Sequence, residues 1–139
     1  MFDKLKKEAT RVINPKQYSD YAEGGQVAAA IETSDGNIYT GICIDTACSL
    51  GFCAEHAAAA DMLKHGETHI VRLVAVDTEG EFLAPCGRCR EFLSQLDKRN
   101  EEMEIALGED DIYRLKDLLP FDWKKIKMEK EHNFKQIKS

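Results

Sequence analysis

The chain has 139 residues, which corresponds to one domain with a core large enough to be stable without disulfides. Hydrophobic residues make up 43% and charged residues 32% of the chain, and this composition excludes a disordered or collagen-like polypeptide. The net charge of −6 disfavours nucleic acid as a partner, because an acidic protein gains no long-range attraction to phosphate backbones.

The charge is distributed unevenly along the chain. Residues 122–139 contain six lysines and three acidic residues, so we predict one domain over residues 1–139 with 122–139 as a basic C-terminal helical tail on an acidic body. There is no run of 18 or more apolar residues and no signal-like apolar segment near Met1. We therefore expect a cytoplasmic protein that makes no membrane contact.

The first third of the chain predicts a helix followed by a β-hairpin. Apolar residues recur at helical spacing from Phe2 to Ile13, and Asn14-Pro15 ends this helix. A loop is expected through Tyr18–Gly25. Gln26–Thr33 and Ile38–Ile44 are predicted as the two strands of the hairpin, because an S-D-G-N turn separates them.

From Cys53 onward the pattern alternates between helices and strands. The predicted elements are a buried helix over Ala54–His65, an interior strand over Ile70–Val76, a helix opened by Pro85, short strands over Glu104–Leu107 and Ile112–Arg114, and a helical turn over Leu115–Leu119. This order predicts an α/β fold, a three-layer α/β/α sandwich with a mixed five-stranded sheet.

Cys86 and Cys89 form a C-x-x-C motif at the start of a predicted helix. Two residues three positions apart share one helical face, so both thiolates can reach one metal ion. A redox pair or two packed thiols would give the same spacing, although a redox pair usually requires a thioredoxin-like context.

Cys53 lies at a second predicted helix start. The free N–H groups and the dipole of a helix N-terminus favour thiolates, so Cys53, Cys86 and Cys89 are predicted to bind one Zn²⁺. Three protein ligands leave one position for water, which is the pattern of a catalytic zinc. Cys43 and Cys48 have no ligand spacing relative to this group, and on spacing alone we interpret them as packing residues.

Glu55 follows Cys53 by two residues, where it can border the metal without binding it. A carboxylate there can take a proton from a zinc-bound water and pass it to a leaving group. A glutamate in a first helical turn can also simply complement the dipole, but the three nearby cysteines favour the catalytic interpretation.

Cys53-Ala54-Glu55 and Pro85-Cys86-Gly87-Arg88-Cys89 together resemble the signature of zinc deaminases. The chain is similar over nearly its whole length to the short, three-cysteine, homotetrameric branch of the cytidine deaminase family. Weaker matches are Val27–Ala30, Gly41–Asp45 and Asp117–Pro120. The resemblance implies hydrolytic deamination of a free cytosine nucleoside, cytidine or deoxycytidine, by a zinc enzyme with Glu55 as its catalytic residue.

The sequence departs from the family pattern at several positions near the predicted site. His56 stands where the family usually has arginine, so His56 or Arg90 is expected to offset the charge of the thiolates. Cys43 and Asp45 stand where the family has N-x-E, whose side chains bind the ribose hydroxyls. We predict that Cys43, Asp45 and Ala54 bind the substrate, and that the half of the pocket that binds the sugar is altered relative to the family.

Three alternative functions remain open from the sequence. The run Cys86–Arg90 also resembles blasticidin S deaminase, so the substrate could be a nucleoside antibiotic or another aminated heterocycle. A non-catalytic zinc protein is a further alternative, which the presence of Glu55 disfavours. Deamination of a polynucleotide is disfavoured by the acidic body of the chain.

Overall fold

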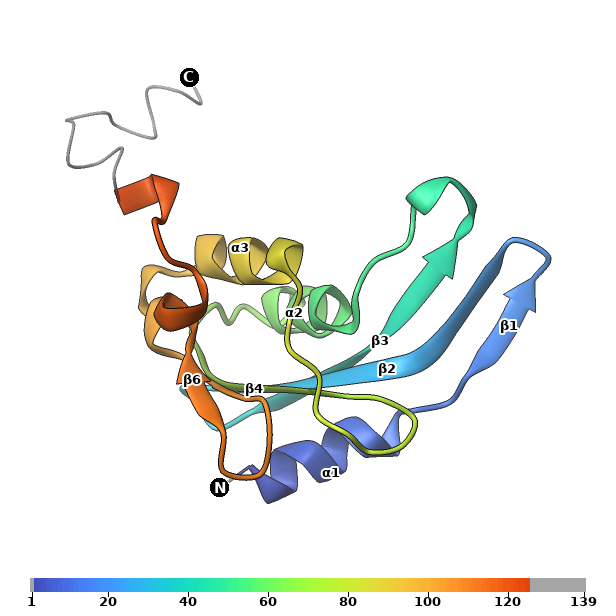
Figure 1. Ribbon diagram of the computed structural model, residues 1–139, viewed down its shortest axis with the longest axis horizontal. Helices are drawn as coiled ribbons and strands as arrows, with labels where there is room; N and C mark the ends of the chain where they lie inside the picture. The colour runs from blue at the N-terminus through green and yellow to red at the C-terminus, as the bar shows by residue number, and fades with distance from the viewer. Residues whose placement is uncertain (1, 126–139) are drawn as a thin grey trace.

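The computed structural model describes residues 2–125, and it has three layers. A twisted sheet lies between the helix α1 (Asp3–Arg11) on one face and the helices α2 (Ala54–Lys64) and α3 (Gly87–Leu96) on the other (Figure 1). This confirms the predicted α/β/α sandwich. The predicted C-terminal tail lies outside the described residues from position 126 onward.

The sheet is mixed and centred on one long strand. Its strands are β1 (Lys16–Ser19), β2 (Ala22–Thr33), β3 (Ile38–Thr46), β4 (Ile70–Val76), β5 (Glu104–Ala106) and β6 (Ile112–Arg114). β2 pairs with β3 along one edge. Along its other edge, β2 pairs with β1 through residues 22–24 and with β4 through residues 28–33, and all three pairings are antiparallel. β4 pairs with β5 in parallel, and β6 closes the sheet antiparallel to β5.

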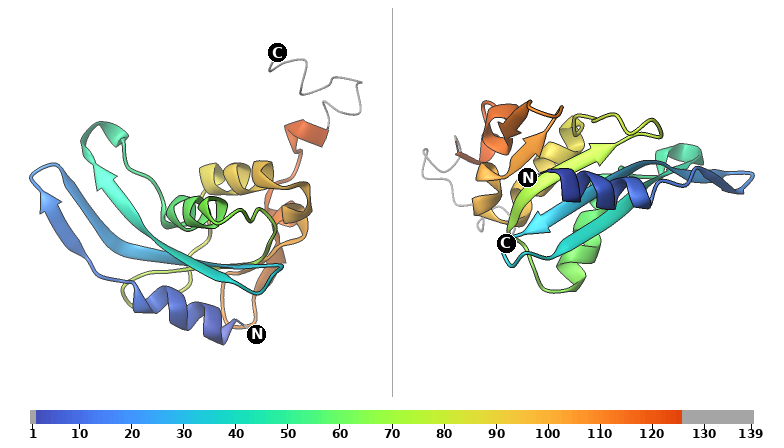
Figure 2. Two further views of the ribbon diagram at one scale, coloured as in Figure 1. Left: turned by 180° about the vertical axis from the view of Figure 1, so that it is seen from behind. Right: turned by 90° about the horizontal axis from the view of Figure 1, so that it is seen from below.

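The described sheet has six strands, whereas the sequence predicted five. The loop expected through Tyr18–Gly25 is in fact β1 and an N-terminal extension of β2. All residues of β1 are exposed, so the strand lacks the apolar alternation from which a half-buried strand is recognised. In the views of Figures 1 and 2 the ends of β1, β2 and β3 project beyond the helices.

The two layers of helices bury separate halves of the core. α1 packs Phe2, Leu5 and Ala9 against small and branched residues of β2 and β4. On the opposite face α2 approaches β3 closely, since a Cβ on Gly41 would lie 2.3 Å from the Ala58 backbone nitrogen. The alanine-rich sequence of α2 permits this approach, which brings the start of the helix next to the end of β3.

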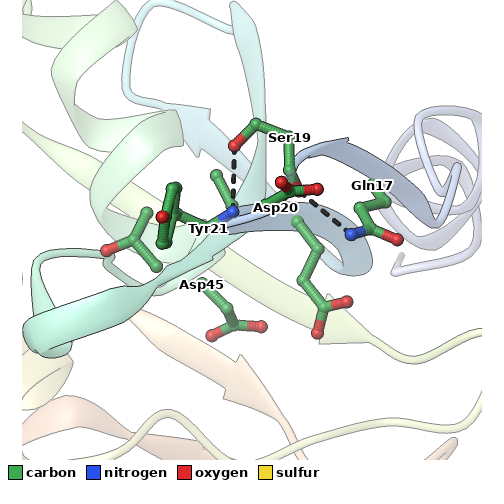
Figure 3. Close-up of a pocket in the computed structure, with 8 residues that line it drawn as sticks. Gln17, Ser19, Asp20, Tyr21 and Asp45 are labelled. Carbon is green, nitrogen blue, oxygen red and sulfur yellow. Dashed lines mark hydrogen bonds between the residues drawn. The ribbon is translucent and has the colours of Figure 1, made fainter.

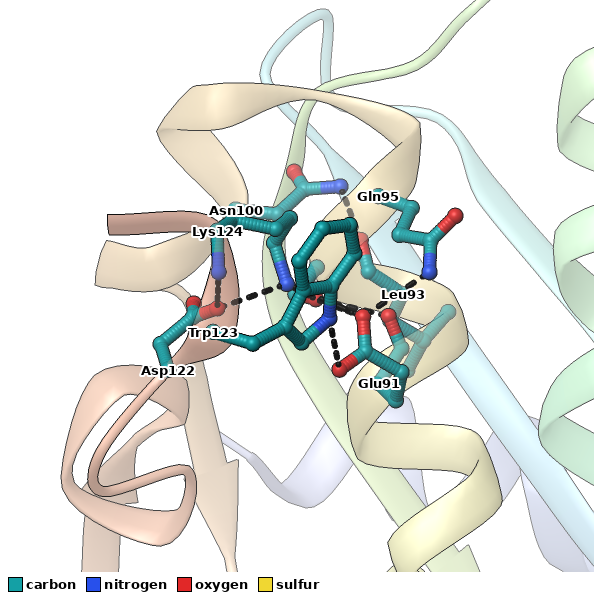
Figure 4. A network of polar contacts seen from close by, with 8 residues as sticks. Glu91, Leu93, Gln95, Asn100, Asp122, Trp123 and Lys124 are labelled. Carbon is teal, nitrogen blue, oxygen red and sulfur yellow. Dashed lines mark hydrogen bonds and ion pairs between the residues drawn. The ribbon is translucent and has the colours of Figure 1, made fainter. Parts of the chain in front are cut away.

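Three short 3-10 segments connect these elements: η1 (Ala47–Ser49), η2 (Lys98–Glu102) and η3 (Leu115–Leu118). The outer side of α3 is held by the segment that follows η3 (Figure 4). Glu91 of α3 accepts hydrogen bonds from the Trp123 indole at 3.0 Å and the Lys124 ammonium at 2.9 Å. None of the helices within residues 2–125 has the length and hydrophobicity needed to cross a membrane.

Asn100 connects the end of α3 with the beginning of β4. Its side chain is fully buried, donates to the carbonyls of Thr68 at 3.1 Å and Leu93 at 3.0 Å, and accepts from the Ile70 amide at 2.8 Å. Figure 4 shows Asn100 beside Leu93. The carboxamide therefore satisfies three backbone groups that are shielded from water.

We expect Asn100→Ala to lower the free energy of unfolding by about 3 kcal/mol, because it leaves buried backbone groups without partners. Chemical denaturation measures the change. The matched control is Asn37→Ala at an exposed position, where the side chain hydrogen-bonds Glu67 and the expected loss is below about 1 kcal/mol. Equal losses for the two variants would contradict the role assigned to Asn100.

Candidate functional site

Three cysteines converge where α2 and α3 begin. Cys53 precedes α2 and Cys86 precedes α3 as their capping residues, and Cys89 lies in the first turn of α3. The Sγ atoms of Cys53 and Cys86 are 3.6 Å apart, and those of Cys86 and Cys89 are 3.5 Å apart. All three sulfur atoms lie within 4.8 Å of one another. The structure thus brings the three predicted ligands together.

The cluster fits a zinc ion in the spacing of its sulfur atoms and in the type of its donor atoms. Tetrahedral coordination with Zn–S bonds of about 2.3 Å requires sulfur atoms about 3.8 Å apart, close to the separations of 3.5 and 3.6 Å found here. Burial raises the pKa of the Cys53 thiol and that of the Cys89 thiol. For Cys86 burial also raises the pKa, but hydrogen bonds, including those from the Cys89 and Arg88 backbone, bring it below its usual value.

Glu55 lies in the first turn of α2, only 4% exposed, and it lines the same cavity as Cys53. Burial raises the pKa of its carboxyl group above the ordinary value, so the group accepts a proton more readily than an exposed glutamate does. A side chain with this property at the edge of a cluster of thiols that fits a metal ion is suited to moving protons.

His56 contacts the cysteine cluster, and Arg90 reaches another part of the fold. The Nδ1 atom of His56 is 3.5 Å from the Cys89 sulfur, and its ring stacks on Phe92 with centroids 4.3 Å apart. Burial, aided by the charge of Arg88, lowers the pKa of His56, so the ring is neutral near pH 7. Arg90 donates instead to the Leu118 carbonyl of η3 at 2.6 Å.

A cavity of about 670 Å³ opens in front of Cys53, Cys86 and Glu55. The three predicted substrate residues, Cys43, Asp45 and Ala54, all line it. Its volume is within the range of small-molecule sites, about 300–1,000 Å³. A smaller cavity, which Gln17, Ser19, Asp20 and Tyr21 line, shares Asp45 with the larger one (Figure 3).

The cavity wall includes polar residues that sequence reasoning missed, among them Glu23, Gln26 and Arg88. Arg88 occupies a variable position of the C-x-x-C motif, where any residue is compatible with ligand spacing. Glu23 lies in the segment predicted as a loop, and its Cα partner across the sheet is Asp45. In the sequence, the pair Gly24-Gly25 indicates irregular backbone just before Gln26.

The curated proteins to which this chain is similar in sequence are cytidine deaminases. No family model matches the chain. The cytidine deaminase of Mycobacterium tuberculosis is 36% identical over 77 residues, 55% of this chain and 55% of that protein, so the match spans about half of the curated relative. A probable cytidine deaminase of Dictyostelium discoideum is 35% identical over 69 residues, 48% of this chain and 47% of that protein.

The likeness to solved structures extends further along the chain. The crystal structure of the Mycobacterium tuberculosis cytidine deaminase superimposes with a TM-score of 0.72 at 32% identity, covering 86% of this chain and 94% of that one. The fold agrees over almost the whole chain of that structure, at an identity of 32%. The chain therefore belongs to the cytidine deaminase family.

Proposed function

We propose that this protein is a zinc-dependent hydrolase that deaminates a free cytosine nucleoside, cytidine or deoxycytidine. Water replaces the exocyclic amine, and the products are the uracil nucleoside and ammonia. The observation that carries this proposal is the buried Glu55 beside three converging thiols at the base of a cavity of about 670 Å³. Membership in the cytidine deaminase family supports it.

Five residues have proposed roles in binding the metal, moving the proton and contacting the base. Cys53, Cys86 and Cys89 would hold Zn²⁺, which when bound supplies Lewis-acid activation of a water molecule. A carboxylate oxygen of Glu55 takes a proton from the attacking water and delivers it to the leaving amine nitrogen. Ala54, at the start of α2, is proposed to contact the base, because it lines the cavity between Cys53 and Glu55.

Two basic residues beside the ligands have different proposed roles. Three thiolates leave a zinc centre with a net negative charge, which weakens the activation of water. His56 is placed to donate a hydrogen bond from its ring to the Cys89 sulfur and so to offset part of this charge. Arg90, also expected at the centre, is proposed to act on it through the contact of α3 with η3.

An ammonia-release assay with purified, zinc-loaded protein tests the proposal. We expect ammonia from cytidine and deoxycytidine, and an absorbance change that corresponds to the uracil product. Adenosine, which also carries an exocyclic amine but on a larger ring system, is the matched control and should remain intact. Failure to release ammonia from any cytosine nucleoside would overturn the proposed function.

A second candidate function is favoured by the acidic pair at the cavity wall. Glu23 and Asp45 are Cα partners across β2 and β3, and both side chains line the cavity. Two like charges placed opposite each other suit a cationic substituent on the substrate. Blasticidin S is therefore a further arm of the assay, and faster deamination of blasticidin S than of cytidine would replace the first candidate with the second.

We propose a homotetramer in the cytoplasm, as expected for the resembled branch of the family. Large apolar side chains are exposed on the projecting end of the sheet and beyond η3, with Tyr21 at 74%, Leu50 at 77% and Phe121 at 91%. Contact between copies of the chain would remove these surfaces from water. Multi-angle light scattering is expected to give about four times the chain mass, and an active monomer would contradict the assembly.

A further inference from the structure

β2 contains a bulge opposite Cys43, next to the cavity. Gly24 pairs with Ile44 and Ala28 with Ile42, so residues 25–27 of β2 together face Cys43 of β3. Gly25 has a φ of +85°, and a Cβ there would lie 2.1 Å from the Asn14 carbonyl oxygen, so this position requires glycine.

The bulge changes the direction of the side chains that follow Gly25. In a regular strand consecutive residues point to opposite faces, so Gln26 and Val27 could not both face one site. Both nevertheless line the cavity in front of the cysteines. Bulges commonly redirect a side chain toward a site, and here the redirected polar group is the Gln26 carboxamide.

Cys43 holds the Gln26 carboxamide in one orientation. The Cys43 thiol donates a hydrogen bond to the Oε1 atom of Gln26 at a distance of 3.4 Å. Cys43 is only 9% exposed, so this contact is partly buried. With Oε1 used in this way, the Nε2 group, which has two N–H donors, is left to face the cavity. Among residues 2–125, no side chain or carbonyl accepts from Nε2.

Asp45 supplies the complementary group on the neighbouring strand. It follows Cys43 by two residues, lines the same cavity, and its carboxylate receives no hydrogen bond from residues 2–125. An amide donor and a carboxylate acceptor on adjacent strands complement a ligand whose groups both accept and donate, and hydroxyl groups have this property.

We propose that Gln26 is a substrate-binding residue that determines specificity for the sugar of the nucleoside. Its N–H donates to a sugar hydroxyl oxygen, and Asp45 accepts a hydrogen bond from a sugar hydroxyl group. Cys43 is then a positioning residue that orients the carboxamide. This inference rests on the proposed function and deepens it, since it assigns sugar recognition to a residue on β2.

The test separates substrate binding from chemistry. Gln26→Leu keeps the size of the side chain and removes its hydrogen bonds, so the KM for cytidine is expected to rise about tenfold while kcat stays within about twofold. Gln17→Leu is the matched control. Gln17 lies on β1, donates to the Ser19 carbonyl, and lines only the smaller of the two cavities (Figure 3).

A second variant tests whether the carboxamide itself is required. Cys43→Asn introduces a carboxamide on β3, next to the position of the Gln26 carboxamide. In the Gln26→Leu background it is therefore expected to reverse most of the tenfold rise in KM. Cys43→Ser keeps a hydroxyl donor for Oε1 and should leave the KM near that of the wild type. Melting temperature and zinc content are measured for every variant to establish that the fold is intact.

The outcomes distinguish this inference from the proposed function. Active wild-type protein together with an unchanged KM in Gln26→Leu would overturn the role of Gln26 and leave the deaminase proposal standing. A raised KM that Cys43→Asn does not reduce would show that the carboxamide is not the group required, which also overturns the inference. Wild-type protein without activity on any nucleoside would overturn both.

Discussion

Glu55→Gln is expected to lower kcat for cytidine by about 10²–10⁴-fold or more, with fold and zinc content unchanged. Glutamine has nearly the same shape as glutamate, so it fits the buried position of Glu55 at the start of α2. It cannot take a proton from water at a carboxylate oxygen, and the same group is proposed to serve more than one proton transfer. The loss should therefore appear in kcat rather than in KM.

Steady-state kinetics on zinc-loaded protein measure this effect, with bound zinc determined on the same samples. Glu67→Gln is the matched control, because Glu67 accepts from Asn37 and Tyr39 near the opposite end of β3. It removes the same charge from a glutamate far from the thiols and should leave kcat within about twofold. If Glu55→Gln retained the wild-type rate, Glu55 would be only a charge at the start of a helix.

Within each of the two motifs, local spacing was enough to predict the geometry of the site. Cys86 and Cys89 lie three residues apart at a helix start, and Glu55 follows Cys53 by two residues, so the geometry within each motif follows from the helix itself. The meeting of the two motifs is a tertiary fact. It was inferred from the resemblance to a family and from the shared preference of helix N-termini for thiolates.

The parts that could not be predicted depend on backbone irregularity and on partners distant in the chain. β1 has a polar sequence in which every residue is exposed, and its pairing with β2 becomes visible only in the structure. The bulge after Gly24 changes which face Gln26 occupies, and strict alternation along the strand gives no sign of that change. His56 and Arg90 were both candidates for offsetting the charge of the thiolates, and it is His56, stacked on Phe92, that lies beside Cys89.

The bulge after Gly24 also explains why the sequence indicated Cys43 and not Gln26 as a residue of the site. The sequence pattern identified position 43 because it aligns with a family residue, and a thiol there is a weak hydrogen-bonding partner for a sugar. The structure shows the thiol engaged with Gln26 instead, so the polar group that faces the cavity comes from the adjacent strand. Under the proposal, the cavity still contains a carboxamide, as in the family pattern, but a residue of β2 supplies it in place of the residue at position 43 of β3.

Cys86→Ala is expected to lower bound zinc from about one ion per chain to well below that, and to abolish turnover. Two thiols remain in this variant, and a catalytic zinc normally requires three protein ligands. Because zinc binds the folded state, its loss should also lower the melting temperature, and the difference from wild type should disappear when a chelator removes zinc from both proteins.

Cys43→Ala and Cys48→Ala are the matched controls for this experiment, since neither sulfur belongs to the group of three that lie within 4.8 Å of one another. Both should retain about one zinc ion per chain by elemental analysis. Cys48 is exposed on η1, so its thiol also controls for nonspecific metal binding by a surface cysteine. Full zinc occupancy in Cys86→Ala would show that the ion is held elsewhere. The proposed activation of water beside Glu55 would then lose its physical basis, because the carboxylate and the metal would no longer share one site.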